Sequence, residues 1–405
     1  MGIIFSSFNG LEVSPKLRFK DENGVTFPCW KKYTLSHFLS SRVEKQIPTN
    51  EAPLMAFTAE GGVTDKGERY DRSFLVKSAD KLYKRTEFND FIYSSNNLDV
   101  GSIGLNKYGT AVISDVYEIF SVNKNGAPDF ISELIQRPFT LHKVLKFRQG
   151  CLYGQYRIYA SDFLSVSVFA PQLKEQKKIN NFLSLIDKRI EKQRQLVESL
   201  KKYKRGLLYL FFETKKPNKK LSELIKIGKA GGTPLSSNPN YYNGKIPFLS
   251  ISDMTNQGKY LYSTDKYISD EGLSNSAAWL VPVNSLIISM YASYGLVAIN
   301  KIELSTSQAM FNIIPQEPND IEFLYYYLSY LSFTGYYDKM VSTGTQPNLN
   351  AEKIKNIPIY IPLDKKEKEK ISKMLLTFED KEKQAQKILS NLEQLKNGLL
   401  QQMFI

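Results

Sequence analysis

Two long stretches of the chain place apolar residues at alternating steps of three and four, with polar residues between them. The first runs from about residue 174 to residue 212, and the second from residue 363 to the end. This spacing is typical of a coiled coil, in which a narrow apolar seam on one helix packs against the seam of another. At about 1.5 Å per residue, the first helix would extend roughly 60 Å, far beyond the average globular helix. The predicted seam positions are Ile179, Phe182, Ile186, Ile190, Leu196 or Val197, Leu200, Tyr203, Leu207 and Leu210 in the first stretch, and Ile371, Met374, Phe378, Ala385, Ile388, Leu392, Leu395, Leu399 and Met403 in the second.

The two stretches are copies of one another. Pro171 recurs as Pro362, and residues 179–206 recur as residues 371–398 at an offset of 192. A period near half the chain length is too long for a solenoid, so it predicts two modules that each end in a long helix. Two narrow seams in one chain most economically bury each other. The seam alone does not distinguish a spacer rod from a helical hairpin that serves only as core.

The region before each long helix has a strand-like pattern, interrupted by Gly, Ser, Thr and Asn. Residues 35–38 (LSHF) open the first region much as residues 221–224 (LSEL) open the second. Predicted strands lie at residues 74–76, 91–93, 111–113 and 119–122 of the first region and at residues 246–251, 285–289, 296–299 and 310–314 of the second, where residues 320–331 form a predicted short helix.

These patterns predict an α+β fold, with two mixed α/β domains separated by two long antiparallel coiled-coil helices in a pseudo-twofold internal repeat. The predicted boundaries are an N-terminal arm at 1–24, a first domain at 25–172, a central spacer helix at 173–214, a second domain at 215–362 and a distal spacer helix at 363–405. The two domains share a frame and differ in content. Such a pair suits a protein that recognises two different targets.

Composition adds a charge argument. With 405 residues, of which 42% are hydrophobic, the chain can bury more than one core, and its formal charge of +13 favours a polyanionic partner. Most of the excess lies between Lys174 and Lys220, where 15 Lys or Arg residues stand against five acids; from Leu363 onward the balance is nine against seven. The central helix therefore either contacts phosphate groups or an acidic partner, or presents an ordinary solvated lysine-rich face.

Catalytic chemistry has little support in the residues. Only two cysteines and two histidines are present, which give no disulfide framework, no predicted metal site and no catalytic triad. The cysteine usage fits a reducing compartment, so we expect the chain in the cytoplasm. Residues 238–241 (NPNY) are similar to the Asn/Asp-Pro-Pro-Tyr/Phe site of amino-methyltransferases, but Asn240 replaces the second proline and no glycine-rich methyl-donor loop precedes it. No catalytic residue is predicted.

Both domains are rich in side chains that contact nucleic acid: Lys and Arg for phosphates and guanine edges, Asn and Gln for adenine, Ser and Thr for either, and Tyr for packing along a groove. The same residues also suit ordinary polar loops that cap a following helix, as Asn350 does in its sequence context. The candidate phosphate contacts are Lys146, Arg148, Arg157 and Lys229. The candidate base contacts are Gln155, Tyr291, Ser293, Gln308, Thr345, Gln346 and Asn348.

Four segments stand out together. They are residues 171–179 (PQLKEQKKI) before the first long helix, their second copy after Pro362, residues 280–289 (LVPVNSLIIS) and residues 344–358 (GTQPNLNAEKIKNIP). With the order of domain, helix, domain and helix over nearly the whole chain, they resemble the specificity subunit of type I restriction-modification systems. One departure is that the second helix begins with residues 363–368 (LDKKEK), without the Glu-Gln pair found at 175–176.

The resemblance implies a non-catalytic subunit in which each domain recognises one half of a split double-stranded DNA site. The helices would set the unread gap and dock two methyltransferase subunits, with restriction subunits able to join. It implies no cofactor in this chain, and partners that use S-adenosylmethionine, ATP and magnesium. Two alternatives remain: a nuclease or methyltransferase that acts alone, and a coiled-coil scaffold for protein interactions. The seam residues proposed for docking or helix pairing are Ile179, Phe182, Ile186, Ile190, Leu200, Ile371, Phe378, Ile388, Leu392 and Leu399.

Overall fold

The computed structural model describes residues 12–58, 61–64, 81–96, 98, 102–152, 155–291, 293–341 and 349–405. The chain divides into two compact units: residues 1–193 with 388–405, and residues 194–387. Each unit contains one mixed α/β module and one half of each long helix. The two units are called the first and second unit below.

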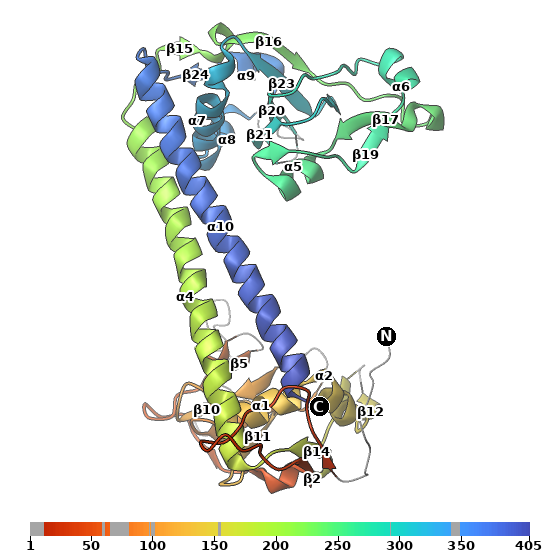
Figure 1. Ribbon diagram of the computed structural model, residues 1–405, viewed down its shortest axis with the longest axis vertical. Helices are drawn as coiled ribbons and strands as arrows, with labels where there is room; N and C mark the ends of the chain where they lie inside the picture. Colours follow the sequence, from red (N-terminus) through yellow and green to blue (C-terminus); the bar gives the residue numbers. More distant parts are fainter. Residues whose placement is uncertain are drawn as a thin grey trace. The chain divides into compact units, whose positions relative to one another are not determined.

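The long helices are α4 (Leu173–Phe212) and α10 (Lys365–Met403), each continuous over its length (Figure 1). In the first unit, Asp187 of α4 pairs with Lys396 of α10 at 2.6 Å. In the second unit, Lys204 of α4 pairs with Glu382 of α10 at 2.8 Å. Because earlier α4 residues meet later α10 residues, the two helices run antiparallel. The predicted α+β fold with a long antiparallel helix pair is confirmed.

The buried seam differs in phase from the predicted one. The buried positions of the two helices are Glu175, Gln176, Ile179, Leu183, Ile190, Gln193, Val197, Leu208 and Phe212 in α4, and Ile371, Leu375, Glu379, Ala385, Leu389, Leu400 and Met403 in α10. Of the alternatives Leu196 and Val197, Val197 is the buried one. Five predicted seam residues are exposed instead: Tyr203 and Leu210 in α4, and Met374, Ile388 and Leu395 in α10. The prediction was wrong at these positions because polar residues occupy part of the true seam. Lys204, Glu382 and Lys396 are half-buried and lie along the seam between the two helices.

The seam of the second unit can be tested with two adjacent residues. Leu375 is completely buried, whereas Met374 is 37% exposed. We expect Leu375→Ala to lower the free energy of unfolding by about 2 to 5 kcal/mol, because it removes buried methyl groups and leaves a cavity. Met374→Ala is expected to cost less than about 1 kcal/mol. Urea denaturation of the two variants provides the measurement, and equal costs would contradict the observed seam.

The first unit is built on a four-stranded antiparallel sheet of order β3-β11-β8-β9. Smaller sheets have the orders β10-β7-β4, β1-β2-β14, β5-β6 and β12-β13. The strands are β1 (Glu12–Val13), β2 (Trp30–Thr34), β3 (Leu39–Ser41), β4 (Lys45–Gln46), β5 (Ala56–Thr58), β6 (Gly62–Thr64), β7 (Tyr83–Thr86), β8 (Phe91–Ser94), β9 (Ile103–Leu105), β10 (Ala111–Ile113), β11 (Tyr117–Val122), β12 (Gln149–Leu152), β13 (Gln155–Arg157) and β14 (Ser167–Ala170). The helices are α1 (Pro128–Gln136), α2 (Pro138–Leu145) and α3 (Ala160–Ser165).

Aromatic side chains join this sheet to α3. The Phe163 ring lies 4.6 Å from that of Tyr93, 5.1 Å from that of Phe120 and 5.9 Å from that of Phe91, measured between centroids. All four residues are fully buried. Because aromatic pairs add to simple burial, this cluster fixes α3, and with it the start of β14 and α4, against the sheet.

The second unit is built on a five-stranded sheet of order β16-β23-β20-β21-β18, antiparallel except for the β18–β21 pair. Smaller sheets have the orders β19-β17-β22 and β15-β24. The strands are β15 (Lys219–Lys220), β16 (Ile225–Ala230), β17 (Tyr242–Leu249), β18 (Tyr260–Leu261), β19 (Lys266–Ile268), β20 (Leu286–Ser289), β21 (Val297–Asn300), β22 (Ser305–Thr306), β23 (Met310–Pro315) and β24 (Pro358–Ile359). The helices are α5 (Ile251–Gln257), α6 (Asp270–Ser274), α7 (Ile321–Phe333), α8 (Tyr336–Met340) and α9 (Ala351–Lys355).

The two units share one plan. The strand order β3-β11-β8-β9 corresponds to β16-β23-β20-β21, and the pair α1 and α2 corresponds to α7 and α8. In each module, an equivalent backbone hydrogen bond joins the first part of the module to its last part. The Leu35 amide donates to the Val166 carbonyl, and the Leu221 amide donates to the Ile357 carbonyl, both at 2.9 Å. The internal repeat seen in the helices therefore extends through the modules.

Most predicted strands exist. Those expected at 91–93, 111–113, 119–122, 285–289, 296–299 and 310–314 are β8, β10, β11, β20, β21 and β23, and the helix expected at 320–331 is α7. The strand expected at 246–251 is β17, but it ends at Leu249 because Ser250 and Asp253 form a capping box that starts α5. The strand expected at 74–76 lies outside the described residues. Helices α1, α2, α3, α5, α6 and α8 were not predicted.

Candidate nucleic-acid interface

Three predicted phosphate contacts of the first unit lie near one hairpin. Lys146 is exposed and directly follows α2, and strands β12 and β13 come next in the chain. The Arg148 guanidinium lies 5.8 Å from the centroid of the Tyr156 ring, and the Arg157 guanidinium lies 5.0 Å from that of Tyr159. The aromatic faces hold both guanidinium groups at the hairpin. The predicted base contact Gln155 begins β13, so it lies on the same hairpin.

Lysines that the sequence did not single out join this basic surface. Burial lowers the pKa of Lys143 below its ordinary value, and the positive charges of Lys32 and Lys146 lower it further. The Lys143 ammonium donates to the Ser167 carbonyl at 3.0 Å. Three lysines from β2 and from α2 and its C-terminal end therefore lie close together. No sequence signal reveals this, because Lys32 and Lys143 are more than a hundred residues apart.

Loops of the second unit bring together three predicted contacts. Tyr291 and Ser293 lie in the turn between β20 and β21, where Ser293 has a positive φ of 58°. The Met290 amide donates to the Ala309 carbonyl at 2.7 Å, which places this turn beside the loop that carries Gln308. The Gln308 side chain accepts a hydrogen bond from the hydroxyl of Thr233, which follows β16.

Two glycines determine the path of the loop that follows β16. A Cβ on Gly231 would lie 2.2 Å from the Thr306 carbonyl oxygen, and one on Gly232 would lie 2.2 Å from the Ala277 carbonyl carbon. Only glycine allows this close approach, which sets the position of the loop. Lys229, near the end of β16, is exposed and lies 5.6 Å from the centroid of the Trp279 ring. The predicted contacts Thr345, Gln346 and Asn348 lie outside the described residues.

The start of each long helix is tied to the module of its unit. The Gln176 side chain of α4 accepts a hydrogen bond from the amide of Ala127, the residue that precedes α1, at 2.9 Å. The same side chain donates to the Pro171 carbonyl at 3.0 Å. Lys368, the equivalent residue of α10, forms an ion pair with Asp320, which precedes α7. Both long helices are therefore connected to their modules at the equivalent position, through a hydrogen bond at Gln176 and through an ion pair at Lys368.

A second tie holds the N-terminal arm. The Arg18 guanidinium donates to both carboxylate oxygens of Glu175, at 3.0 and 2.7 Å. Glu175 is completely buried. A bidentate pair of this kind is geometrically specific. The residues preceding β2 are thereby anchored on the first turn of α4.

A buried charge cluster lies in the second unit. The ammonium of Lys259, a residue 3% exposed, lies 2.7 Å from Glu322, 3.1 Å from Glu379 and 2.7 Å from the Tyr326 hydroxyl. Burial raises the pKa of the Glu379 carboxyl, but Lys259 and the hydrogen bond from Tyr326 outweigh burial and hold that pKa below its usual value. Burial and Glu379 raise the pKa of Tyr326. The cluster therefore contains a charged carboxylate and a neutral phenol.

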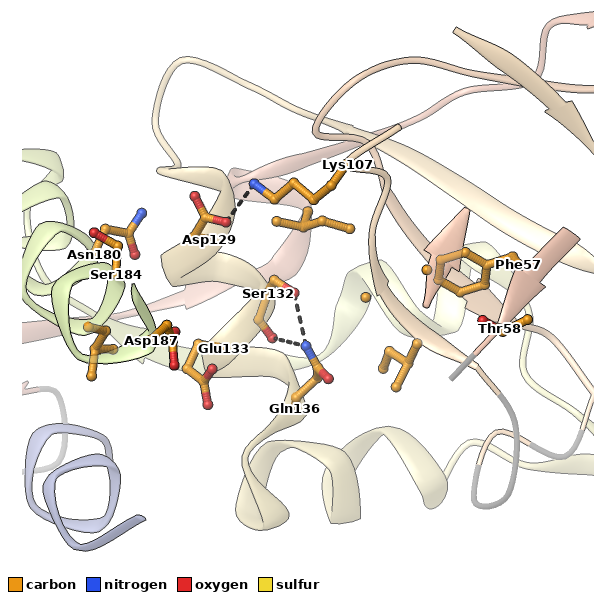
Figure 2. A pocket seen from close by; sticks show the side chains of 15 residues that line it. Phe57, Thr58, Lys107, Asp129, Ser132, Glu133, Gln136, Asn180, Ser184 and Asp187 are labelled. Carbon is orange, nitrogen blue, oxygen red and sulfur yellow. Dashed lines mark hydrogen bonds and ion pairs between the residues drawn. The ribbon is translucent and has the colours of Figure 1, made fainter. Parts of the chain in front are cut away.

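The first unit contains a cavity of about 570 Å³ between α1, α4 and β9. Figure 2 shows Asp129, Ser132 and Glu133 projecting from α1, with Ser184 and Asp187 on the neighbouring helix α4. Figure 2 also shows Lys107 paired with Asp129 at 2.6 Å. The cavity is thus lined by three acids, by Lys107, by small polar side chains and by apolar side chains that include Phe57, Ile103 and Leu183.

Among the residues that the structure describes, no His, Cys, Asp and Glu side chains form a group of three or more placed to bind a metal ion. Within the same residues, no helix is long and apolar enough to cross a membrane.

Comparison with known proteins gives both curated relatives and solved structures. The chain is 35% identical over 145 residues to the type I restriction enzyme HindI specificity subunit of Haemophilus influenzae, a match that covers 36% of this chain and 31% of that protein. It is 27% identical over 189 residues to the MjaIX specificity subunit of Methanocaldococcus jannaschii, covering 46% and 43%. The chain thus spans less than half the length of these curated relatives.

The fold is similar to solved structures over nearly the whole chain. The type I restriction-modification S subunit from M. genitalium matches with a TM-score of 0.58 and 16% identity, over 97% of this chain and 99% of that one. A chain from a structure of the assembly and conformational transition of the type I R-M system matches with a TM-score of 0.57 and 17% identity, over 92% and 96%.

The family model of the type I restriction modification DNA specificity domain matches residues 42–202 and 213–394. The first match covers the region from β4 to β14 and most of α4, and the second covers the region from β15 to β24 and most of α10. The two matches together take in well over half of the chain and follow its internal repeat. The chain therefore belongs to the family of type I restriction modification DNA specificity domains.

Proposed function

We propose that this chain is the DNA-recognition subunit of a type I restriction-modification complex and performs no chemistry itself. The observation that carries the proposal is the double family match, one specificity domain for each repeat of the fold. The basic residues around Lys146 and Arg148 and the loops around Lys229 and Gln308 give each unit a polar, cationic surface suited to DNA.

Each module recognises one half of a bipartite double-stranded site. The two candidate surfaces differ in structure: a hairpin with paired aromatic and guanidinium groups in the first unit, and converging turns in the second. Different side chains present different donors and acceptors to the major groove, so the two half-sites differ in sequence. The long helices α4 and α10 set the number of unrecognised base pairs between the two half-sites.

The partners are two methyltransferase subunits, which dock at the repeated scaffold and supply S-adenosylmethionine chemistry on adenine. Restriction subunits that use ATP and magnesium join this core. The tie between long helix and module supports two docking sites of similar plan, because Gln176 and Lys368 make equivalent connections with different bonds. The assembly acts in the cytoplasm, where it has access to the chromosomal DNA.

Mapping of methylated adenines in the host genome tests the proposal. We expect a bipartite methylated sequence with a fixed gap, which disappears when the gene for this chain is deleted and returns when the gene is restored. The methyltransferase gene stays intact in both strains, so loss of methylation reports recognition. An unchanged methylation map in the deletion strain would exclude the proposed role.

Substitution of Lys229 tests the candidate interface of the second unit. We expect Lys229→Ala to weaken binding of the complex to all DNA sequences alike, and to reduce the slope of log affinity against log salt by about one, because one phosphate contact is lost. Lys226→Ala, at another exposed lysine of β16, is the matched control. Fluorescence titrations at several salt concentrations provide the measurement, and equal behaviour of the two variants would remove Lys229 from the interface.

A further inference from the structure

A buried lysine joins the second module to α10. The Ile299 amide of β21 donates to the Lys259 carbonyl at 2.7 Å, so the backbone of Lys259 is fixed beside the edge strand of the five-stranded sheet. Its ammonium lies 3.1 Å from Glu379 of α10 and 2.7 Å from Glu322 of α7. The hydroxyl of Tyr326, also on α7, donates to Glu379 at 2.8 Å. Sheet, α7 and α10 therefore meet at one set of charged and hydrogen-bonded groups.

Another polar bond joins α10 to the module nearer the start of the helix. Lys368 forms an ion pair with Asp320, which directly precedes α7. Lys368 and Glu379 are eleven residues apart. This separation is about three helical turns, or about 16 Å, so both residues lie on the same face of α10. A helix bonded at one point can pivot about that point, whereas two bonds along one face fix its direction. The bond between Lys259 and Glu379 is the one that removes the pivot.

Apolar packing completes this contact but fixes its direction less strictly. Ile371 and Leu375 of α10 share one core with Phe323 and Tyr327 of α7. Burial of apolar surface is non-directional and depends mainly on area, so it discriminates weakly between small tilts of α10. Charge-assisted hydrogen bonds depend on both distance and angle. A single buried polar residue sets the register of an apolar coiled-coil seam in the same way.

The first unit pairs the equivalent acids differently. The two acids that hold Lys259 correspond to Asp187 of α4, by the offset of 192 residues between the long helices, and to Asp129 of α1. The second correspondence follows from the shared buried pattern, which is Phe130, Ile131, Leu134 and Ile135 in α1, and Phe323, Leu324, Tyr327 and Leu328 in α7. Asp187 pairs with Lys396 of α10, and Asp129 pairs with Lys107 of its own module (Figure 2). One pair lies within the long helices and the other within the module, so neither joins the module to a helix.

We propose that Lys259 is a positioning residue for the spacing between the two half-sites. By bonding the edge of the sheet and α7 to Glu379, it fixes the direction in which α10 leaves the second module, and with it the distance at which that module reads DNA. This inference rests on the proposed function, which supplies the bipartite site. A tilt of about 7° displaces a point about 30 Å along a helix by about 3.5 Å, close to the rise of one base pair. Lys259 therefore acts on spacing and not on base identity.

Binding of the full complex, assembled with methyltransferase subunits, to matched DNA duplexes tests this role. The duplexes carry the same two half-sites, separated by the native gap or by a gap one base pair shorter or longer. The double variant Lys259→Met/Glu379→Gln removes the bond without leaving one partner as an unpaired buried charge. Tyr326→Phe removes one hydroxyl with little change in shape. We expect the double variant to lower the preference for the native gap by about 10-fold and Tyr326→Phe to lower it by about 3-fold, with base preference within each half-site unchanged.

Two controls separate positioning from stability. Leu375→Ala removes a completely buried side chain from the same contact of α10. Asp187→Asn alters the equivalent acid of the first unit, which pairs within the long helices. Both variants should keep the wild-type preference for the native gap, although Leu375→Ala lowers the melting temperature.

An unchanged gap preference in both the double variant and Tyr326→Phe would overturn the inference, even where affinity falls equally at every gap. If the double variant does not assemble, the result for Tyr326→Phe decides alone. A preference lost to the same extent in Leu375→Ala would also overturn it, because spacing would then follow stability. In these cases the wild-type complex still binds the bipartite site, so the proposed function stands. If the wild-type complex binds no bipartite site, the proposed function fails, and the inference fails with it.

Discussion

Replacement of Lys259 by alanine is expected to lower the free energy of unfolding of the second unit by about 3 to 5 kcal/mol. The reason is that removal of one partner leaves buried charge uncompensated, which costs far more than the pair itself contributes. Glu379 and Tyr326 would lose the ammonium that lies within 3.1 Å of both. Urea-induced unfolding of the full chain, followed by hydrogen exchange in residues of the second unit, provides the measurement.

The cost of Lys259→Ala should depend on pH. In the wild type, the pKa of Glu379 is lowered, so its contribution to stability is present above the ordinary glutamate pKa and is lost as the pH falls through the lowered value. Without Lys259, burial should instead raise this pKa, and stability then decreases as the pH rises. The difference between variant and wild type should therefore be larger at pH 7 than at pH 4.

A neighbouring lysine provides the matched control. Lys383 lies 3.7 Å from Glu379, and its side chain is 55% exposed. Lys383→Ala is expected to cost less than about 1 kcal/mol, as exposed pairs do. A cost for Lys259→Ala that is the same at pH 4 and pH 7, or that equals the cost at Lys383, would show that Lys259 is not the central charge of the cluster.

The long helices were predictable because their signal is repeated many times along each helix and again in the second copy. The positions of the buried seam were less predictable than the helices themselves. At Leu196 and Val197, two apolar residues stand side by side, and the hydrophobic pattern cannot choose between them. The true seam includes Lys204 and Lys396, whose charges pair across the helices instead of pointing away. Hydrophobicity alone assigns such residues to the solvent side.

Within the modules, strands with continuous apolar runs were found from sequence, and short helices were missed. Helices α1 and α2 each begin with proline, Pro128 and Pro138, which marks either a turn or a first helical position. Their amphipathic faces are too short for the helical period to stand out. Tertiary packing of Phe130 and Ile131 against the sheet decides the outcome.

The residues of the candidate sites could be named only by type. The proximity of Tyr291 and Gln308 depends on a backbone hydrogen bond between Met290 and Ala309, and that of Lys32 and Lys143 depends on how β2 meets α2. The Lys259 cluster joins positions 120 residues apart. Contacts of such sequence separation have no local pattern, so they come only from the folded structure.

A change in helix length tests the role of α4 and α10 as a spacer. Four residues inserted after Lys201 in α4, together with four inserted after Ala385 in α10, lengthen both helices at positions that face each other, as the Lys204–Glu382 pair indicates. The insertion adds about 6 Å and about 40° of rotation. One base pair advances about 3.4 Å and rotates about 35°. We therefore expect the recognised gap to widen by one or two base pairs, with both half-sites unchanged.

The four-residue insertion is a local break in the heptad that coiled coils tolerate by slight unwinding, so the paired insertion should retain a folded chain. Insertion into α4 alone should instead shift the two seams out of register and lower the melting temperature. The control for sequence is a chain in which the same four residues replace residues 198–201, which should leave the gap unchanged. Sequencing of methylated sites in cells that carry each variant provides the measurement. Since length is the only property that separates the paired insertion from this control, a wider gap in the former alone would identify the helices as the spacer, and an unchanged gap with full methylation would rule it out.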